Sequence, residues 1–525
     1  MTEECPAASS TLPDLPAPRE SRWWLSIPMV SMALILLYPV GLVALIRRRS
    51  RRRWTKVLAA LAALPVFVLV MLVSLQRYWE FDGGMSLAGF RLDFSKGSAQ
   101  FERVESHRRH QPSPASEMGV SNSGVNSAVE AVDLAALSWP AFRGEYRDGV
   151  VRDGTVISLD WRKDPPRERW RQPVGEGYAS FVLGGGRLYT IEQRRDQEVI
   201  ACYLADTGRE LWTQGYDAYF KEQLGGDGPR ATPTLDADRL YALGAAGQLT
   251  CLDIADGRIV WTRNILTGFG AENLQWGMSA SPLIDGERLI VTNSGAGGGS
   301  IMAYRKADGT LIWQSEMGKQ GYSSPIVATL LGRPMVLNFA AFELNGLDPQ
   351  TGTRLWSFPW ATGMGITCSQ PIVVDDAHVF ISLGYGIGSA MVELTQANGK
   401  ITARPKWTST RLKNKFTSSV IHDGAIYGLD ETVMACLDLD TGKLNWKGGR
   451  YGYGSVLLVG DHLLVFGEYG ELALVQATPT EHREIGRIRI LEGKSWNNAA
   501  LAGGLLFARN HKDMVCYDLR PAAQR

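Results

Sequence analysis

The sequence predicts an all-β fold, a β-propeller of eight four-stranded blades, preceded by two transmembrane helices. Two long uncharged segments lie near the N-terminus, and from Trp170 onward one unit recurs with a mean period of about 45 residues. Helical periodicity is absent from the repeated region. The expected regions are an extracytoplasmic tail over 1–23, a transmembrane hairpin over 24–76, a linker over 77–138 and the propeller over 139–525.

The two uncharged segments predict the membrane anchor and its orientation. They cover 23 residues at 24–46 and 20 residues at 57–76, and about 20 helical residues cross a bilayer core. Six arginines and one lysine lie between them, at 47–49, 51–53 and 56. By the positive-inside rule this loop stays in the cytoplasm. We therefore expect an inner-membrane anchor and a periplasmic propeller, and a second span argues against a cleaved signal peptide.

Charge and cysteine content exclude two classes of function. The net charge is +1, and residues beyond 76 carry 46 basic against 50 acidic side chains, so a nucleic-acid interface has no electrostatic basis. No two of the six cysteines have the close spacing of a metal or redox site. Four of them recur at one position of the repeat, which indicates small buried side chains. The cysteines are Cys5, Cys202, Cys251, Cys368, Cys436 and Cys516.

The clearest repeated feature is an acidic or amide residue, then Gly, then Trp four residues after the Gly. It is typical of a tight turn in which the acid or amide bonds the local backbone and Gly adopts positive φ. Asn398, Gly399 and Trp407 form a looser copy. We expect the tryptophans to be structural: Trp170, Trp212, Trp261, Trp313, Trp356, Trp407 and Trp446.

A second repeated feature gives the number of blades. It is a small or polar residue followed by an apolar strand, a turn and another apolar strand, and four short strands per unit suit a propeller. We expect the first blade to begin near Trp170 and the last to end near Leu519, and the sequence leaves the mode of ring closure open. The eight copies begin at Ser180, Thr232, Ser281, Ser324, Gln370, Ser419, Ser455 and Ala499.

These repeats resemble the tryptophan-docking repeat of pyrroloquinoline-quinone (PQQ) propellers, over residues 139–520. Quinoprotein alcohol dehydrogenases and the outer-membrane assembly lipoprotein BamB share that repeat. Residues 139–144, Trp-Pro-Ala-Phe-Arg-Gly, also look like the segment that precedes the first blade in bacterial PQQ-repeat proteins. The resemblance implies a quinoprotein-type propeller in which each Trp docks between neighbouring blades.

Equivalent loops of successive blades should open on one face, and three of them suggest a ligand site. Amides, an acid, lysines and indoles around one axis suit a flat, anionic or peptide-like ligand. The alternative is that these side chains satisfy the backbone and fill the centre of the ring. The longer loop over 216–230 is a second place for a partner contact. The candidates are Glu272, Asn273, Trp276, Lys413, Asn414, Lys415, Trp496 and Asn497.

Two functions follow from the sequence. The first is a non-catalytic, membrane-anchored scaffold that binds a protein or small ligand, with no metal site. The second is a PQQ-dependent dehydrogenase that oxidises an alcohol or sugar and passes electrons to the membrane. The resemblance implies PQQ with Ca²⁺ for the second, yet the chain lacks the adjacent cysteine pair and we find no matching Ca²⁺ acids or catalytic Asp. The sequence therefore favours the scaffold and no cofactor.

Overall fold

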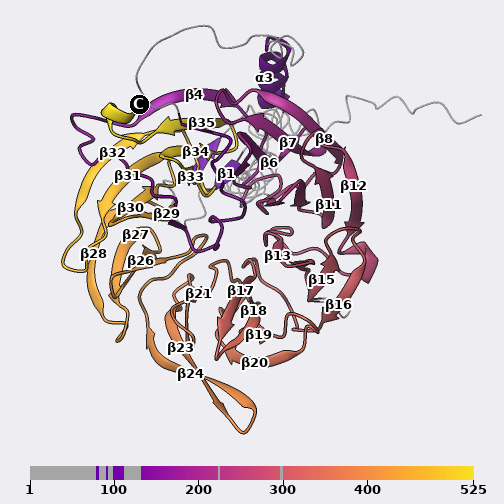
Figure 1. Cartoon of the computed structure of the whole chain (residues 1–525), viewed down its shortest axis with the longest axis vertical. Helices are drawn as coiled ribbons and strands as arrows, with labels where there is room; N and C mark the ends of the chain where they lie inside the picture. Colours follow the sequence, from indigo (N-terminus) through magenta and orange to yellow (C-terminus); the bar gives the residue numbers. More distant parts are fainter. Residues whose placement is uncertain (1–78, 82–89, 93–97, 112–131, 223–224, 296–299) are drawn as a thin grey trace, which may run out of the picture. The chain divides into compact units, whose positions relative to one another are not determined.

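The computed structural model describes residues 79–81, 90–92, 98–111, 132–222, 225–295 and 300–525. It confirms the all-β fold as a ring of eight blades (Figure 1). The predicted transmembrane segments, 24–46 and 57–76, lie outside the described residues. Among the residues that the structure describes, no helix is both long and apolar enough to cross a membrane. The strands β1 (Trp79–Phe81) and β2 (Phe90–Leu92) form a separate two-stranded sheet.

Six consecutive blades are antiparallel sheets whose four strands follow the chain order from the axis outwards (Figure 1). Short 3-10 helices lie at Thr267–Phe269 and at Ala522–Gln524. The first three blades contain β5 (Val182–Gly184), β6 (Arg187–Arg194), β7 (Gln197–Leu204) and β8 (Glu210–Asp217); β9 (Thr234–Asp236), β10 (Arg239–Leu243), β11 (Gln248–Asp253) and β12 (Ile259–Asn264); and β13 (Leu283–Asp285), β14 (Arg288–Thr292), β15 (Ile301–Arg305) and β16 (Leu311–Ser315). The next three contain β17 (Ile326–Leu330), β18 (Arg333–Phe339), β19 (Glu343–Leu347) and β20 (Arg354–Pro359); β21 (Ile372–Val373), β22 (His378–Leu383), β23 (Gly388–Ala397) and β24 (Lys400–Ser409); and β25 (Val420–His422), β26 (Ala425–Asp430), β27 (Val433–Asp438) and β28 (Leu444–Arg450).

The last two blades borrow strands from the segment before the first blade. In the seventh, β3 (Val150–Val151) runs parallel to the inner strand β29. In the eighth, β4 (Arg167–Pro173) is the outer strand, and Trp170 pairs with Cys516. The two ends of the propeller therefore close the ring within one sheet. The remaining strands are β29 (Ser455–Val459), β30 (His462–Phe466), β31 (Glu471–Gln476), β32 (Glu484–Arg489), β33 (Ala500–Ala502), β34 (Leu505–Arg509) and β35 (Asp513–Asp518).

This closure corrects one expectation from the sequence. The first blade begins at Val182 and not near Trp170, because the strand that holds Trp170 belongs to the last blade. The seventh blade also has five strands where four were expected. Both departures arise because the N-terminal segment adds strands to the last two blades: β4 completes the eighth sheet and so ties the chain ends together, and β3 covers the inner edge of the seventh.

Six of the seven repeat tryptophans bond to the next blade. Their indole N–H groups donate to backbone carbonyls there, over 2.8 to 3.1 Å. Trp212 and Trp407 are half-buried, and the others are buried. Each bond spans the seam between two sheets and fixes their relative position. The pairs are Trp170 with Ala205, Trp212 with Ile254, Trp261 with Lys306, Trp313 with Pro349, Trp407 with Leu439 and Trp446 with Thr478.

The glycine of the next turn provides the surface on which an indole lies. Gly309 has φ +67°, and a Cβ added to it would lie 2.7 Å from the Trp261 ring. A Cβ on Gly257 would lie 2.4 Å from Trp212. Neither distance is compatible with a real side chain, so the turn needs Gly for its φ and for this contact. The acid of the motif acts as expected, since Asp308 Oδ1 accepts from the Thr310 N–H over 2.9 Å.

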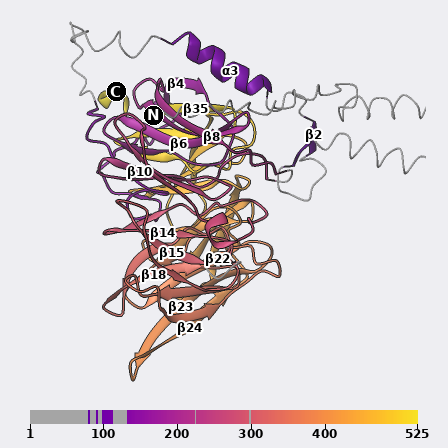
Figure 2. The ribbon, with the colours of Figure 1, turned by 90° about the vertical axis from the view of Figure 1, so that its right-hand side faces the viewer.

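Trp356 does not bond to a backbone carbonyl of the next blade. The reason is that the next blade carries the looser copy of the motif. The β23–β24 hairpin of the next blade extends well beyond the other blades (Figures 1 and 2). Gly399 lies at its tip with nothing close to it. Trp356 donates instead to the sulfur of Met335 over 3.2 Å, and Leu394 of the hairpin packs in the same apolar cluster as Trp356.

The seventh blade lacks a tryptophan, and the N-terminal segment provides one. Gly486 pairs with Leu474 at the position that Trp occupies in other blades. A Cβ on Gly486 would lie 2.7 Å from Cβ of Trp161. The Trp161 ring is buried and donates to the carbonyl of Ser158 over 2.9 Å. An indole from outside the repeat therefore covers the outer strand of this blade.

A belt of hydroxyl groups joins the inner strands around the axis. The Ser180 N–H donates to the Thr232 hydroxyl over 2.9 Å, and the Thr232 N–H to the Ser281 hydroxyl over 3.0 Å. The Ser281 N–H in turn donates to the Ser324 hydroxyl over 2.8 Å. These four residues begin the first four of the eight copies of the second repeated feature. A hydroxyl at this position satisfies a backbone N–H of the preceding copy, whereas Gln370 and Ala499 have no hydroxyl there.

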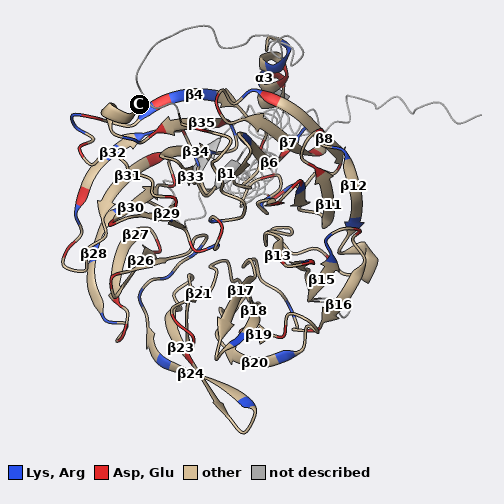
Figure 3. Ribbon diagram, viewed as in Figure 1, with Lys and Arg blue, Asp and Glu red and all other residues tan. Residues whose placement is uncertain are grey.

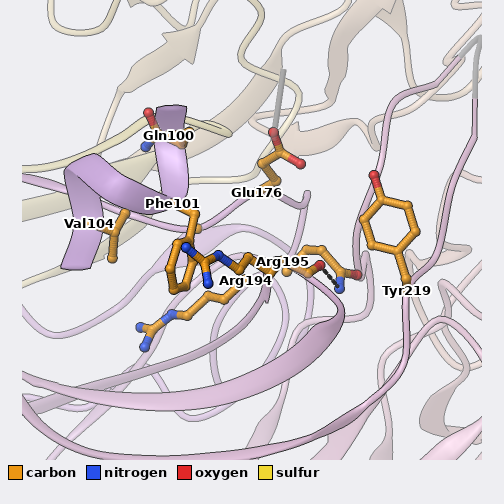
Figure 4. A pocket seen from close by; sticks show the side chains of 9 residues that line it. Gln100, Phe101, Val104, Glu176, Arg194, Arg195 and Tyr219 are labelled. Carbon is orange, nitrogen blue, oxygen red and sulfur yellow. Dashed lines mark hydrogen bonds between the residues drawn. The ribbon is translucent and has the colours of Figure 1, made fainter. Parts of the chain in front are cut away.

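The helix α3 (Ser98–Arg109) lies over the seam between the eighth and first blades, within the region expected to be a linker. Gln100 donates to the carbonyls of Val174 and Lys512 over 2.8 and 2.7 Å. A cavity of about 30 Å³ is lined by Phe101 and Val104 of α3 and by residues such as Arg194 of the first blade (Figure 4). The bonds of α3 on both sides of the seam secure the closure of the ring.

We expect Gly309→Ala to lose more stability than Gly286→Ala. Both glycines have positive φ, at +67° and +57°, but only a Cβ at position 309 meets an indole. The shared φ cost is about 1–2 kcal/mol, and overpacking adds about 1–3 kcal/mol at position 309. Denaturant unfolding of both variants measures the difference. Equal losses would contradict the docking role of the glycine.

Candidate functional site

Eight loops share one end of the propeller. Because the strands of a blade alternate in direction, every loop from an outer strand to the next inner strand opens at the same end. The loops joining the second and third strands open there as well. We call this the loop end. The loops from outer to inner strands cover 174–181, 218–233, 265–282, 316–325, 360–371, 410–419, 451–454 and 490–499.

Each of the eight loops contributes a side chain to one connected group, which we call the axial cluster. It is mostly aromatic and contains three cations. Tyr385 joins it from the loop between β22 and β23. The axial cluster consists of Tyr178, Arg230, Trp276, Tyr322, Cys368, Tyr385, Lys415, Phe416, Tyr453, Lys494 and Trp496.

Trp496 and Phe416 form one side of the axial cluster. Their ring centroids lie 4.7 Å apart, although they come from loops before different blades. Trp496 also lies 5.7 Å from the Tyr178 ring, and Phe416 lies 5.4 Å from the Tyr453 ring. Four loops therefore meet through aromatic contacts alone.

Trp276 and Tyr322 form the other side. Their rings meet edge to face with centroids 5.4 Å apart. Tyr322 also lies close enough to Arg230 and Cys368 to interact with them electrostatically. The guanidinium of Arg230 lies 5.5 Å from the Tyr178 ring. Through the Tyr178 ring, Arg230 joins a fifth loop to the four of the first side.

Cations lie against the aromatic rings at three points. The Nζ of Lys415 lies 4.3 Å from the Tyr453 ring and 5.1 Å from the Tyr385 ring. The Nζ of Lys494 lies 4.4 Å from the Trp496 ring. Such contacts hold a cation in place against the ring. Acidic and basic residues are interspersed around the whole ring of blades (Figure 3).

One buried acid orients the aromatic groups. Glu468, 3% exposed, accepts from the Trp496 indole N–H over 2.9 Å and from the Tyr453 backbone N–H over 3.1 Å. It lies in the loop between β30 and β31, which also opens at the loop end. Both carboxylate oxygens have donors, so Glu468 fixes the Trp496 ring.

Three titratable groups of the axial cluster, Tyr322, Cys368 and Tyr385, stay in their neutral forms at neutral pH. Burial raises the pKa of Tyr322 to about 12 and that of Cys368 to about 12. Burial also raises the pKa of Tyr385 well above its ordinary value. A protonated thiol is a poor nucleophile, so the cluster is suited to binding and not to covalent chemistry at Cys368.

The structure brings three of the eight candidates together. Trp276, Lys415 and Trp496 belong to the axial cluster. Ligand binding by them stays a prediction. Asn414 and Asn497 are buried and donate to backbone carbonyls, Asn414 to Leu429 over 3.1 Å and Asn497 to Ala179 over 3.0 Å. These amides satisfy the backbone, as the alternative interpretation proposed.

The other three candidates have different surroundings. Lys413 forms an ion pair with the buried Asp430, which Lys447 also contacts over 2.6 Å. Burial raises the pKa of Asp430, but the two ammonium groups outweigh it and hold that pKa below its ordinary range. Glu272 is exposed, and the Asn273 amide donates to the Ala245 carbonyl over 2.9 Å.

Several members of the axial cluster were not among the candidates. Four of them, Tyr178, Tyr322, Cys368 and Tyr453, stand two residues before the repeated small or polar residue that begins an inner strand. Arg230 holds the same position and lies in the loop over 216–230. Alignment of the eight copies at that position would have found this signal.

The resemblance to PQQ propellers implies PQQ and Ca²⁺ as cofactors. The residues of the axial cluster suit PQQ but do not suit Ca²⁺. Aromatic faces and cations suit a flat anion. Ca²⁺ needs six to eight oxygen ligands, whereas the oxygens of Glu468 are already bonded and three cations lie nearby. Among the described residues, no group of three or more His, Cys, Asp or Glu could hold a metal ion.

Solved structures similar to this chain include a BamB and a quinohemoprotein alcohol dehydrogenase. BamB from Moraxella catarrhalis is 16% identical, with a TM-score of 0.48, over 67% of this chain and 99% of that chain. The quinohemoprotein alcohol dehydrogenase from Comamonas testosteroni is 12% identical, with a TM-score of 0.52, over 80% of this chain and 84% of that chain. A search of curated proteins finds no match.

A family model assigns the chain. The model described as outer membrane protein assembly factor BamB matches residues 152–264 and 195–448, which together exceed half of the 525 residues. The repeats it matches are those whose tryptophans join neighbouring blades. The chain belongs to the BamB family of PQQ-like β-propellers.

Proposed function

We propose that this protein is a membrane-anchored periplasmic scaffold that binds a flat or peptide-like anionic ligand at its axial cluster, without catalysing a reaction. The observation that carries the proposal is that side chains from five loops meet through ring and cation contacts, namely Tyr178, Arg230, Phe416, Tyr453 and Trp496. Residues distant in sequence meet there, on loops that the blades hold in place. A surface assembled in this way is typical of a recognition site.

The chemistry of the axial cluster supports an anionic partner. Arg230, Lys415 and Lys494 all lie on aromatic rings, so an acidic group could pair with a cation while an attached ring stacks beside it. The donor set argues against the dehydrogenase, since Ca²⁺ at the axial cluster would meet three cations, and both oxygens of Glu468 already accept hydrogen bonds. PQQ remains useful as a probe because it is flat and carries several carboxylates.

The anchoring part of the proposal rests on the sequence. Residues 24–46 and 57–76 are uncharged and flank a loop with seven basic residues. The positive-inside rule then directs residues beyond 77 out of the cytoplasm. The ligand or partner would therefore meet the loop end in the periplasm.

We expect PQQ to bind the full-length chain without Ca²⁺ and to quench its tryptophan fluorescence, because Trp496 and Trp276 lie in the axial cluster. Lys415→Glu should weaken binding at least tenfold through charge repulsion. Titration of fluorescence against PQQ measures both affinities.

Lys319→Glu is the matched control, because Lys319 is an exposed lysine in a loop of the same end. It changes the net charge equally and should leave the affinity unchanged. Equal weakening by both variants would refute a specific site. Reduction of a dye on addition of Ca²⁺ and an alcohol or sugar would instead establish the dehydrogenase.

We expect alkaline phosphatase fused after Arg525 to be active, because that enzyme folds only outside the cytoplasm. A reporter that works only in the cytoplasm should be silent at the same position. Deleting residues 57–76 from the fusion removes the second span, leaves the basic loop in the cytoplasm and should reverse both readings. A cytoplasmic signal from the intact fusion would overturn the proposed orientation.

A further inference from the structure

Ion pairs join α3 to the two blades at which the ring closes. Arg103 pairs with Asp513 of the eighth blade, with 2.7 Å between Nη2 and Oδ1. Arg108 pairs with Glu210 of the first blade. Gln100 adds bonds to two backbone carbonyls at the same seam. A helix from outside the repeat therefore bridges the closing seam through polar groups.

The ion pairs near the start of α3 are open to solvent and to salt. The Arg103 side chain is 49% exposed. Glu102 and Arg195 form a third pair, and both of their side chains are 56% exposed. Salt at 0.1 M screens exposed charges over about 10 Å, and each exposed pair contributes little to stability. The strength with which these pairs hold α3 therefore depends on the ionic strength.

Apolar contacts add little to the docking of α3. Val104 is 3% exposed, and the guanidinium of Arg195 lies over the Phe101 ring, 3.9 Å from its centroid. The space beside these side chains is not filled, since the cavity of about 30 Å³ lies between them and the first blade (Figure 4). Atoms that line a void lose the contacts that close packing would give. Incomplete packing therefore leaves much of the docking to the charged groups.

The helix depends on docking for its own stability. It has 12 residues, and an isolated helix shorter than about 12–15 residues is marginal in water. His107, Arg108 and Arg109 in its last turn suit the negative end of the helix dipole, but its first turn carries no acid. Release from the ring should therefore unfold α3, so docking and helix formation are one equilibrium.

We propose that α3 is a reversible clasp across the closing seam, which releases as the ionic strength rises. Release also changes the tether. With α3 docked, residues 77–97 separate the span predicted over 57–76 from the ring. With α3 released, the separating chain extends to residue 131, because Val132 packs against the core of the ring. The change of tether length rests on the proposed anchoring, and the release by salt does not.

Hydrogen exchange of the full-length chain, at about 0.05 M and about 0.5 M NaCl, tests the release. The amides of α3 should exchange at least tenfold faster at the higher salt, while those of β6 and β7 keep their rates. Arg108→Gln should show the fast exchange already at the lower salt. Arg109→Gln is the matched control, because Arg109 is an exposed arginine of the same turn. It should exchange as wild type does.

A charge exchange keeps the test decisive if Arg108→Gln disturbs the first blade. Arg103→Glu should speed the exchange of α3 at low salt, and adding Asp513→Lys should slow it again, because the pair re-forms with its charges reversed. Exchange of α3 that does not respond to salt, equal effects of Arg108→Gln and Arg109→Gln, or failure of this rescue would overturn the clasp.

The tether is tested on the full-length chain in lipid nanodiscs, by energy transfer from a dye on the propeller to labelled lipids. Lys400→Cys, combined with Cys5→Ser, places the dye at an exposed position of the β23–β24 hairpin. Transfer should fall at high salt in wild type, and already at low salt when Arg108→Gln is added, because a longer chain lets the ring move farther away. Unchanged transfer despite fast exchange in α3 would refute the change of tether length. A chain that does not insert into the nanodiscs would refute the proposed anchoring instead.

Discussion

The position of every loop depends on one contact, an indole from one blade lying on a glycine in the turn of the next. The Trp261 pair shows both parts, a bond to the Lys306 carbonyl over 2.9 Å and a ring against Gly309. Because this contact recurs across the seams, errors in blade orientation do not accumulate around the ring. Where it is missing, the β23–β24 hairpin or Trp161 takes its place.

Closure of the ring brings chemistry from distant sequence positions to the axis. Tyr178 and Trp496 are separated by most of the propeller sequence, yet their rings lie 5.7 Å apart because β4 completes the last blade. From the loop end inwards, the axis carries aromatic rings with cations and then the hydroxyl groups that precede the inner strands. Glu468, the buried acid beside the rings, is bonded to Trp496 and to the Tyr453 backbone.

The repeats made the fold predictable because each motif residue has a local cause. Asp308 and Gly309 form a turn, and Trp261 needs such a glycine beside it. Ring closure and the role of Trp161 were not predictable, since both depend on pairing between chain ends. The candidate site was predicted in part: Trp276, Lys415 and Trp496 share a loop end that follows from strand alternation. The direction of each side chain does not follow from strand alternation. Lys413 was therefore included among the candidates, although it pairs with Asp430.

The central claim is that loops far apart in sequence form one binding surface around the axis. Hydrogen exchange of the full-length chain, with and without PQQ, tests it most directly, because it reports each loop separately. If these loops form one binding surface, the backbone amides within 174–181, 410–419 and 490–499 should become protected together at the same PQQ concentration. Protection confined to one blade, or to outer strands alone, would contradict it.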